Sequence, residues 1–216
     1  MHKTVENLIN IESNIKSTLK NVKLPKIIAV SKTFDIDKII PLIEYGHLDF
    51  GENKVQEAID KWTTIKQKNF EIKLHMIGKL QTNKVKFAVK IFDYIHSVDS
   101  EKLAKKISEE QKKINRKVKI FIQVNIGSEN QKSGINKNQL NELINFSKKI
   151  GLDVIGIMCI PPLNEDPKIY FKEMMKLKEL NNFNDLSMGM SSDYLEACKF
   201  NSTFLRIGSS IFGIRS

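Results

Sequence analysis

The sequence predicts an α/β protein, a (β/α)8 TIM barrel in which eight parallel strands alternate with helices and an extra helix precedes the first strand. Short apolar segments rich in β-branched residues alternate with longer segments of helical periodicity, as in consecutive βαβ units. The 216 residues suffice, since such barrels use roughly 200 to over 400. No linker, repeat or low-complexity stretch divides the chain, so residues 1–216 are expected to form one domain. An open, doubly wound sheet is the alternative for the same alternation.

The first half of the chain supplies one leading helix and four pairs of strand and helix. Helix 3–20 carries apolar residues close to the 3.6-residue period. Each later strand is apolar and ends at a polar or glycine turn, and each later helix has apolar residues three and four apart. In order, the pairs are strand 27–32 with helix 35–45, strand 48–51 with helix 54–67, strand 71–77 with helix 82–91, and strand 93–98 with helix 101–114.

The second half continues the pattern and then stops short of a final helix. The pairs are strand 118–126 with helix 137–149, strand 153–159 with helix 167–181, and strand 185–190 with helix 194–200. The last strand, 203–207, is followed only by the short segment 209–216. Helix 3–20 is therefore expected to occupy the vacant eighth helix position, beside strand 27–32.

The charge balance is basic, with 35 lysines and arginines against 25 acidic residues and a formal net charge of +10. Such a charge is compatible with nucleic-acid binding. Only Arg116, Arg206 and Arg215 are arginines, however, and no basic cluster is interleaved with aromatic residues. We therefore expect no specific nucleic-acid partner.

Targeting and metal-binding signals are also absent from the sequence. No apolar run approaches the roughly 18 residues of a membrane span, and the first residues lack the apolar core of a signal peptide. A cytoplasmic protein with no membrane partner is expected. Cys159 and Cys198 are isolated, and the histidines show no metal-ligand spacing, so neither a disulfide nor a metal site is predicted. His75 and His96 are expected to be hydrogen-bonded core residues.

Lys32 stands at the carboxyl end of the first expected strand. Alternation places it on the same face as Ile28 and Val30, among apolar neighbours. Burial disfavours the ammonium form of a lysine, and a neutral amine can attack a carbonyl to form a Schiff base. The plain alternative is a lysine that extends from a strand end into solvent.

The loops after the last two expected strands have the composition of a phosphate site. They contain Ser191-Ser192 and Gly208-Ser209, and in such barrels phosphate often binds after strands seven and eight. Barrel closure would bring this phosphate site beside Lys32, so one ligand could place its phosphate in the site and its aldehyde at the lysine. Pyridoxal 5′-phosphate is such a ligand, and Arg206 would face its ring nitrogen. A guanidinium does not readily give up its proton, so that nitrogen would stay mostly unprotonated.

Six motifs occur together and in order along nearly the whole chain, from about residue 26 to 213. They contain Ala29-Val-Ser-Lys32-Thr, Phe50-Gly-Glu-Asn53, His75-Met-Ile-Gly78-Lys, Lys132-Ser-Gly134, Leu186-Ser-Met-Gly-Met-Ser191 and Leu205-Arg-Ile-Gly-Ser209. In this combination the chain resembles the pyridoxal phosphate homeostasis protein family, which consists of single-domain relatives of the barrel domain of alanine racemase. Met76 stands where bulkier residues are common in that family.

The resemblance implies a site and a function. Lys32 would hold the cofactor as an aldimine, Arg206 would face the pyridine nitrogen, Asn53 would line the ring pocket, and the phosphate would bind at Ser191, Gly208 and Ser209. The implied function is homeostasis of vitamin B6 and of amino and keto acids, without established turnover and without catalytic residues. Apo-enzymes that require pyridoxal phosphate would be possible recipients of the cofactor, and a monomer is expected. Lys132 would be either a second, transient lysine or a solvated loop residue.

A weak racemase-like enzyme is the alternative function. Alanine racemase uses two bases on opposite faces of its substrate, the aldimine lysine and a tyrosine of a separate β domain in the partner subunit. The chain ends at Ser216, with no further segment for such a domain. The sequence therefore favours binding and transfer of the cofactor over catalysis.

Overall fold

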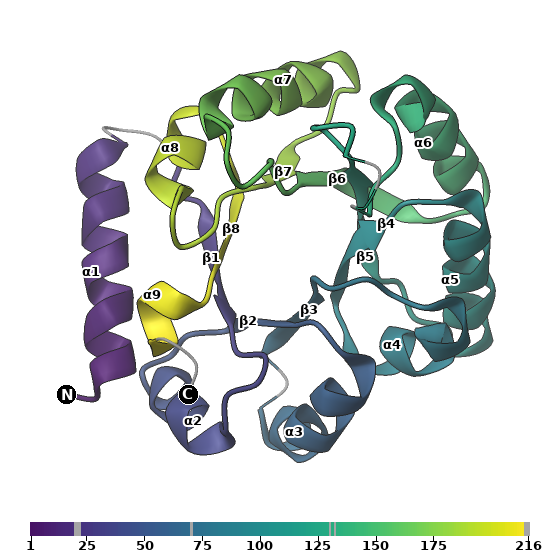
Figure 1. The fold of residues 1–216 in the computed structure, drawn as a ribbon. Helices are drawn as coiled ribbons and strands as arrows, with labels where there is room; N and C mark the ends of the chain where they lie inside the picture. Colours follow the sequence, from purple (N-terminus) through teal and green to yellow (C-terminus); the bar gives the residue numbers. More distant parts are fainter. Residues whose placement is uncertain (20–22, 70, 130, 132, 214–216) are drawn as a thin grey trace.

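The computed structural model of the chain is a closed barrel of eight parallel strands that hydrogen-bond in chain order, with β8 returning to pair with β1. It describes residues 1–19, 23–69, 71–129, 131 and 133–213. Figure 1 looks into the ring of strands and shows the helices as an outer layer around it. The predicted (β/α)8 fold is confirmed, and the open-sheet alternative is wrong.

The strands follow the predicted segments with small shifts at their ends. They are β1 (Lys26–Val30), β2 (Asp49–Glu52), β3 (Lys73–Met76), β4 (Tyr94–Val98), β5 (Lys119–Val124), β6 (Asp153–Cys159), β7 (Asp185–Ser187) and β8 (Phe204–Ile207).

Four strands, β1, β3, β5 and β7, end one to three residues earlier than predicted, and the ends of β1 and β7 lie beside the candidate site. β1 stops at Val30 because the Phe34 amide donates to the Ser31 carbonyl and Thr33 adopts a positive φ of 66°, so the chain turns around Lys32. β7 stops at Ser187 because Gly189 takes a φ of 91°, a conformation that glycine adopts without strain.

The helices also follow the predicted order. They are α1 (Lys3–Thr18), α2 (Ile36–Glu44), α3 (Val55–Lys68), α4 (Val85–Ile91), α5 (Glu101–Lys113), α6 (Leu140–Lys149), α7 (Pro167–Leu180), α8 (Tyr194–Lys199) and α9 (Ser209–Phe212), with 3-10 turns η1 (Thr82–Lys84) and η2 (Lys137–Gln139) opening α4 and α6. The sequence did not predict α9. The end of predicted helix 3–20, at Lys20, lies outside the described residues.

α1 completes the outer layer of helices. It packs against α8, α9 and α2, as Figure 1 shows, and thus fills the place that the short segment after β8 leaves open. Its buried residues Val5, Leu8, Ile11 and Ile15 lie three and four apart, so they form one apolar face. The Asn7 side chain also donates to the Ile211 carbonyl at 2.9 Å. The predicted position of the amino-terminal helix is confirmed.

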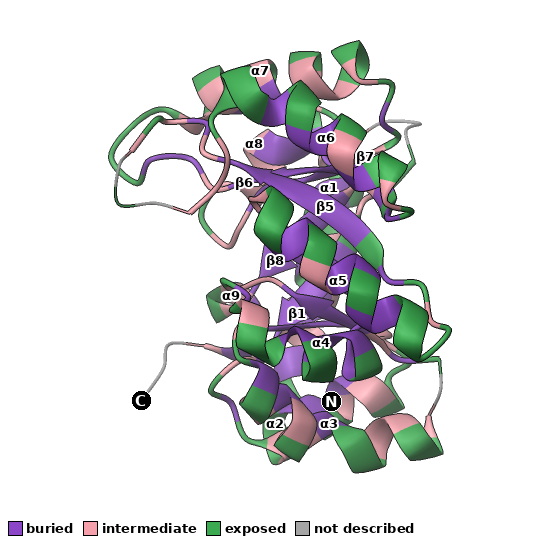
Figure 2. Cartoon of the chain, turned by 90° about the vertical axis from the view of Figure 1, so that its right-hand side faces the viewer, coloured by how far each residue is buried: buried purple, intermediate pink, exposed green. Residues whose placement is uncertain are grey.

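The core consists of two apolar layers separated by the sheet. The inner layer fills the barrel and consists of Ile28, Tyr94, Phe121, Met158 and Phe204. The larger outer layer lies between the strands and the helices. Figure 2 shows buried strands and helices that are buried along one side and exposed along the other. Among the described helices, none is long and apolar enough to cross a lipid bilayer.

Candidate functional site

A pocket of about 550 Å³ opens at the carboxyl ends of the strands. Its lining comes from six strand-to-helix connections and from the strand ends themselves. The lining residues are Val30, Lys32, Phe34, Asn53, Ile77, Ile160, Met190, Ser191, Ser192, Arg206, Gly208, Ser209 and Gly213. All six residues that the sequence singled out as a binding set lie in this lining. The structure therefore brings them together around one space, from β1, β2, β7 and β8.

Barrel closure explains how residues so distant in sequence meet. Ile28 of β1 pairs in register with Arg206 of β8, and the next pair along the strands is Ala29 with Ile207. Lys32 follows β1 and Gly208 follows β8, so both stand at the same edge of the sheet. Lys132 lies outside the described residues, so its place relative to the pocket is not described.

Lys32 is half-buried and sits between two residues that are firmly held. Ser31 is fully buried, its hydroxyl donates to Glu52 Oε1 at 2.8 Å, and its carbonyl accepts from Lys61 Nζ at 2.9 Å. On the other side, the Thr33 amide donates to Glu57 Oε1. A β-branched residue rarely adopts the positive φ of Thr33, so these contacts hold a strained turn.

Lys61 connects Glu52 and Glu57, the two carboxylates that contact the residues on either side of Lys32. Its ammonium lies 3.0 Å from Glu52 Oε1 and 3.1 Å from Glu57 Oε1, and its side chain is 11% exposed. Trp62, fully buried, donates its indole N–H to Glu52 Oε1 at 2.9 Å. One ammonium, two carboxylates and one indole thus fix the backbone on both sides of Lys32.

Glu52 has an unusual environment for a carboxylate. It is fully buried, and its Oε2 has no hydrogen-bond partner among the residues that the structure describes. Burial raises the pKa of Glu52 above its ordinary 4.5, against the opposing effects of Trp62 and Lys61. The protonated form is therefore favoured more in the native protein than in the unfolded chain.

This shift predicts a pH dependence of stability. Between pH 4.5 and the raised native pKa, the native state binds more protons at Glu52 than the unfolded state, so its contribution to stability falls as the pH rises. Glu52→Gln removes this titration. We expect the stability of the variant relative to wild type to increase with pH over that window, by at most about 1.4 kcal/mol per pH unit.

Urea unfolding of both proteins at a series of pH values measures the difference. Glu71→Gln is the matched control, because it makes the same substitution at an exposed glutamate. A constant difference between Glu52→Gln and wild type across the series would contradict the raised pKa.

Arg206 places a fixed cation in the wall of the pocket. It is only 4% exposed, and its guanidinium donates to Ser187 Oγ at 2.7 Å and to the Cys159 carbonyl at 2.8 Å. Burial lowers the pKa of Arg206 from its ordinary value, but a guanidinium keeps its proton at physiological pH. The group is therefore a donor of hydrogen bonds and not a proton source.

Hydroxyl and amide groups gather in the loops that follow β7 and β8. Ser191 Oγ accepts from the backbone amides of Gly208 at 3.3 Å and Ser210 at 3.2 Å. The Asp193 carboxylate accepts from the Met190 amide and thereby closes the turn that presents Ser191. The Ser191 hydroxyl, whose own proton is not used in these two bonds, and the small Gly208 and Ser209 form a cluster with the chemistry of an anion site.

The sequence missed the apolar part of the lining and the buried groups behind it. Ile77 and Ile160 directly follow β3 and β6, so their position after a strand end was an available signal. His75 and His96 were expected to be hydrogen-bonded core residues, and this is confirmed, since both are fully buried and bond to each other at 3.0 Å. Among the described residues, no group of three or more metal-ligating side chains is gathered.

Comparison with known proteins gives consistent results. The family model for the alanine racemase N-terminal domain matches residues 7–216. The pyridoxal phosphate homeostasis protein of Pasteurella multocida is 35% identical and aligns over 97% of both chains, and that of Escherichia coli K12 is 32% identical over 88% of this chain and 85% of its own.

Solved structures agree with these relatives. PipY of Synechococcus elongatus with PLP bound is 30% identical, with a TM-score of 0.85, and the match covers 97% of this chain and 100% of PipY. Alanine racemase of Clostridium difficile shares the fold at 18% identity, with a TM-score of 0.75. That match covers 99% of this chain and 57% of the racemase.

Proposed function

Because the chain belongs to the pyridoxal phosphate homeostasis protein family, we propose that its pocket holds pyridoxal 5′-phosphate (PLP) and that the protein stores and supplies this cofactor. The observation that carries the proposal is the convergence of a lysine amine, a buried guanidinium and a hydroxyl and amide cluster on one pocket. The name of the relatives and the PLP-bound PipY structure support it. In the cell this role would balance vitamin B6 and the amino and keto acids that depend on it.

The residues present fit each part of the cofactor. The Lys32 amine would condense with the aldehyde, forming a C=N bond and releasing water. Arg206 would donate to the ring nitrogen, while Ser191, Gly208 and Ser209 would donate to the phosphate. Asn53 would line the ring. A volume of about 550 Å³ is within the ordinary range for a pocket of this kind.

The lining favours storage over catalysis. PLP provides an electron sink when it is bound, but racemisation also needs a second base on the far side of the substrate. Among the described lining residues, Lys32 is the only amine, and none is a tyrosine, histidine or carboxylate. A weak racemase-like activity is the alternative, and exchange of an amino-acid α-proton with deuterium faster than free PLP promotes it would favour that alternative.

The hydroxyl and amide cluster at Ser191, Gly208 and Ser209 predicts a large difference in affinity between PLP and pyridoxal, which lacks the phosphate. Each hydrogen bond to a charged group contributes roughly 1.5–3 kcal/mol, so loss of two such bonds should weaken binding about 100-fold or more. Equilibrium titration, followed by the absorption of the bound ligand, measures both affinities.

Inorganic phosphate provides the matched control, because it should compete with PLP and leave pyridoxal binding unchanged. Borohydride reduction and peptide mapping then identify the labelled lysine. Equal affinities for PLP and pyridoxal, or a protein that takes up neither, would refute the proposal.

We also propose that the protein is monomeric and passes PLP to PLP-requiring apo-enzymes. The closed sheet supports a monomer, since it leaves no edge strand to pair with a second chain. Sedimentation equilibrium decides the first point. Activation of an apo-enzyme across a membrane that retains both proteins, at the same rate as in a mixed solution, would exclude direct transfer.

A further inference from the structure

Four consecutive hydrogen bonds join Arg206 to the opposite end of the barrel. Arg206 Nη1 lies 2.7 Å from Ser187 Oγ, and Ser187 Oγ lies 2.9 Å from His96 Nδ1. His96 Nε2 lies 3.0 Å from His75 Nδ1, and His75 Nε2 lies 3.0 Å from Asp49 Oδ1. Five side chains from β2, β3, β4, β7 and β8 thus form one line, which we call the axial chain.

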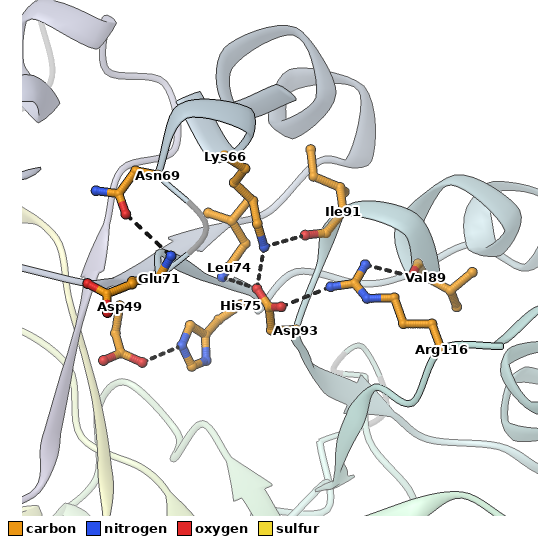
Figure 3. A network of polar contacts seen from close by, with 10 residues as sticks. All are labelled: Asp49, Lys66, Asn69, Glu71, Leu74, His75, Val89, Ile91, Asp93 and Arg116. Carbon is orange, nitrogen blue, oxygen red and sulfur yellow. Dashed lines mark hydrogen bonds and ion pairs between the residues drawn. The ribbon is translucent and has the colours of Figure 1, made fainter. Parts of the chain in front are cut away.

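The axial chain runs through the apolar interior of the barrel. Its three middle members, Ser187, His96 and His75, are fully buried. The His75 ring stacks on Tyr94 and the His96 ring stacks on Phe121, each with centroids 4.3 Å apart. Asp49, the last member, is partly exposed, and Figure 3 shows its carboxylate beside the His75 ring.

The chemistry of the two ends fixes every proton in between. A guanidinium can only donate, so Ser187 Oγ accepts from Arg206. An ionised Asp49 can only accept, which leaves Nδ1 of each neutral ring as an acceptor, so the Ser187 proton goes to His96 Nδ1. His96 consequently carries its proton on Nε2 and donates to His75 Nδ1. His75 then carries its proton on Nε2 and donates to the Asp49 carboxylate, which can only accept.

The local electrostatics agree with two neutral imidazoles. Burial lowers the pKa of His75, and burial together with the charge of Arg206 lowers the pKa of His96 well below its ordinary value. Although burial alone would raise the pKa of Asp49, the His75 hydrogen bond and the nearby Lys26 keep it low. A cation at one end and an anion at the other therefore enclose a neutral chain.

We propose that Ser187, His96, His75 and Asp49 are positioning residues, which hold Arg206 against the pocket and leave the axial chain no proton to give to the bound ring. In each of the four links of the axial chain, the donor hydrogen points away from the pocket and toward Asp49. The proposal deepens the proposed function and rests on it, because it assigns the unprotonated state of the ring nitrogen to four residues that do not touch PLP. Such a site suits storage, since an unprotonated ring is a weak electron sink.

The first test needs no cofactor. In protein labelled with nitrogen-15 at histidine, long-range proton-nitrogen correlation spectra distinguish the two tautomers of each ring. We expect His75 and His96 to be neutral and protonated at Nε2 in the PLP-free protein. A signal set showing His96 protonated at Nδ1, or either ring charged at neutral pH, would overturn the proposal.

The second test removes one link. Ser187→Ala takes away the acceptor of Arg206 and the donor of His96, so PLP should bind about tenfold more weakly and the absorption band of the bound cofactor should shift. The matched control is Ser97→Ala, because Ser97 is also a buried serine and its hydroxyl has no hydrogen-bond partner among the described residues. This control should retain the affinity and the band of wild type.

The two proposals fail in different ways. If wild type binds no PLP, the proposed function fails, and the tautomers still decide whether the axial chain is ordered as described. If wild type binds PLP and Ser187→Ala has the same affinity and the same band, the positioning role is refuted and the binding function stands.

Discussion

Lys32→Ala should eliminate covalent attachment of PLP while leaving the barrel folded. The substituted side chain is half-buried in a turn beyond the end of β1, so its removal leaves no large cavity in the core. Without the amine no C=N bond can form, and borohydride should fix no label on the chain. The hydroxyl and amide cluster stays intact, so weak, reversible binding of PLP should persist. Absorption spectra and peptide mapping after reduction measure the loss.

A matched control separates this effect from the general loss of a lysine. Lys54 is exposed and immediately precedes α3, next to Asn53, but it is absent from the pocket lining. Lys54→Ala should therefore keep the wild-type label. A label that persists in Lys32→Ala and maps to Lys61 would show that the amine has been misassigned, since Lys61 contacts the same turn at the Ser31 carbonyl.

Trp62→Ala should be the most destabilising single change in the support of the site. The indole is fully buried against Phe50, and truncation of such a residue costs about 3–5 kcal/mol. The change also removes one of the three donors to Glu52 Oε1, while Glu52 Oε2 has no hydrogen-bond partner among the described residues. Chemical denaturation measures the free energy of unfolding.

Trp62→Phe separates the two contributions. Phenylalanine fills much of the volume but cannot donate, so its effect should be close to that of the lost hydrogen bond to a carboxylate, about 1.5–3 kcal/mol. Because Glu52 also holds Ser31, this variant should slow the reaction of Lys32 with PLP even where the fold survives. Equal stability of the alanine and phenylalanine variants would contradict the importance of packing at this position.

The fold was predictable because the pattern that specifies it is local. Each strand and helix has its own periodicity, and the short segment after β8 indicated that α1 must complete the ring of helices. The errors also have local causes. Gly189 and Thr33 turn the chain through positive φ, and composition alone did not show that β7 and β1 would end before them.

The candidate site was predictable only in part. Lys32, Arg206 and the serine and glycine loops follow strand ends, which all meet at one face of a parallel barrel. The contacts behind them depend on pairings across the sheet that no local pattern contains. Lys61 reaches Glu52 from nine positions further along the chain, and His96 reaches Ser187 across 91 positions. Sequence spacing therefore indicated which residues face the ligand and not which residues hold them.

The pairing of β1 with β8 has a consequence for the synthesis of the protein. The first strand cannot find its second neighbour until the last strand has been made, and α1 likewise packs against α9. Until β8 has been synthesised, the wall of the pocket that Arg206, Gly208 and Ser209 form is absent. A pocket that contains both Lys32 and Gly208 therefore forms only after β8 has been synthesised and has paired with β1.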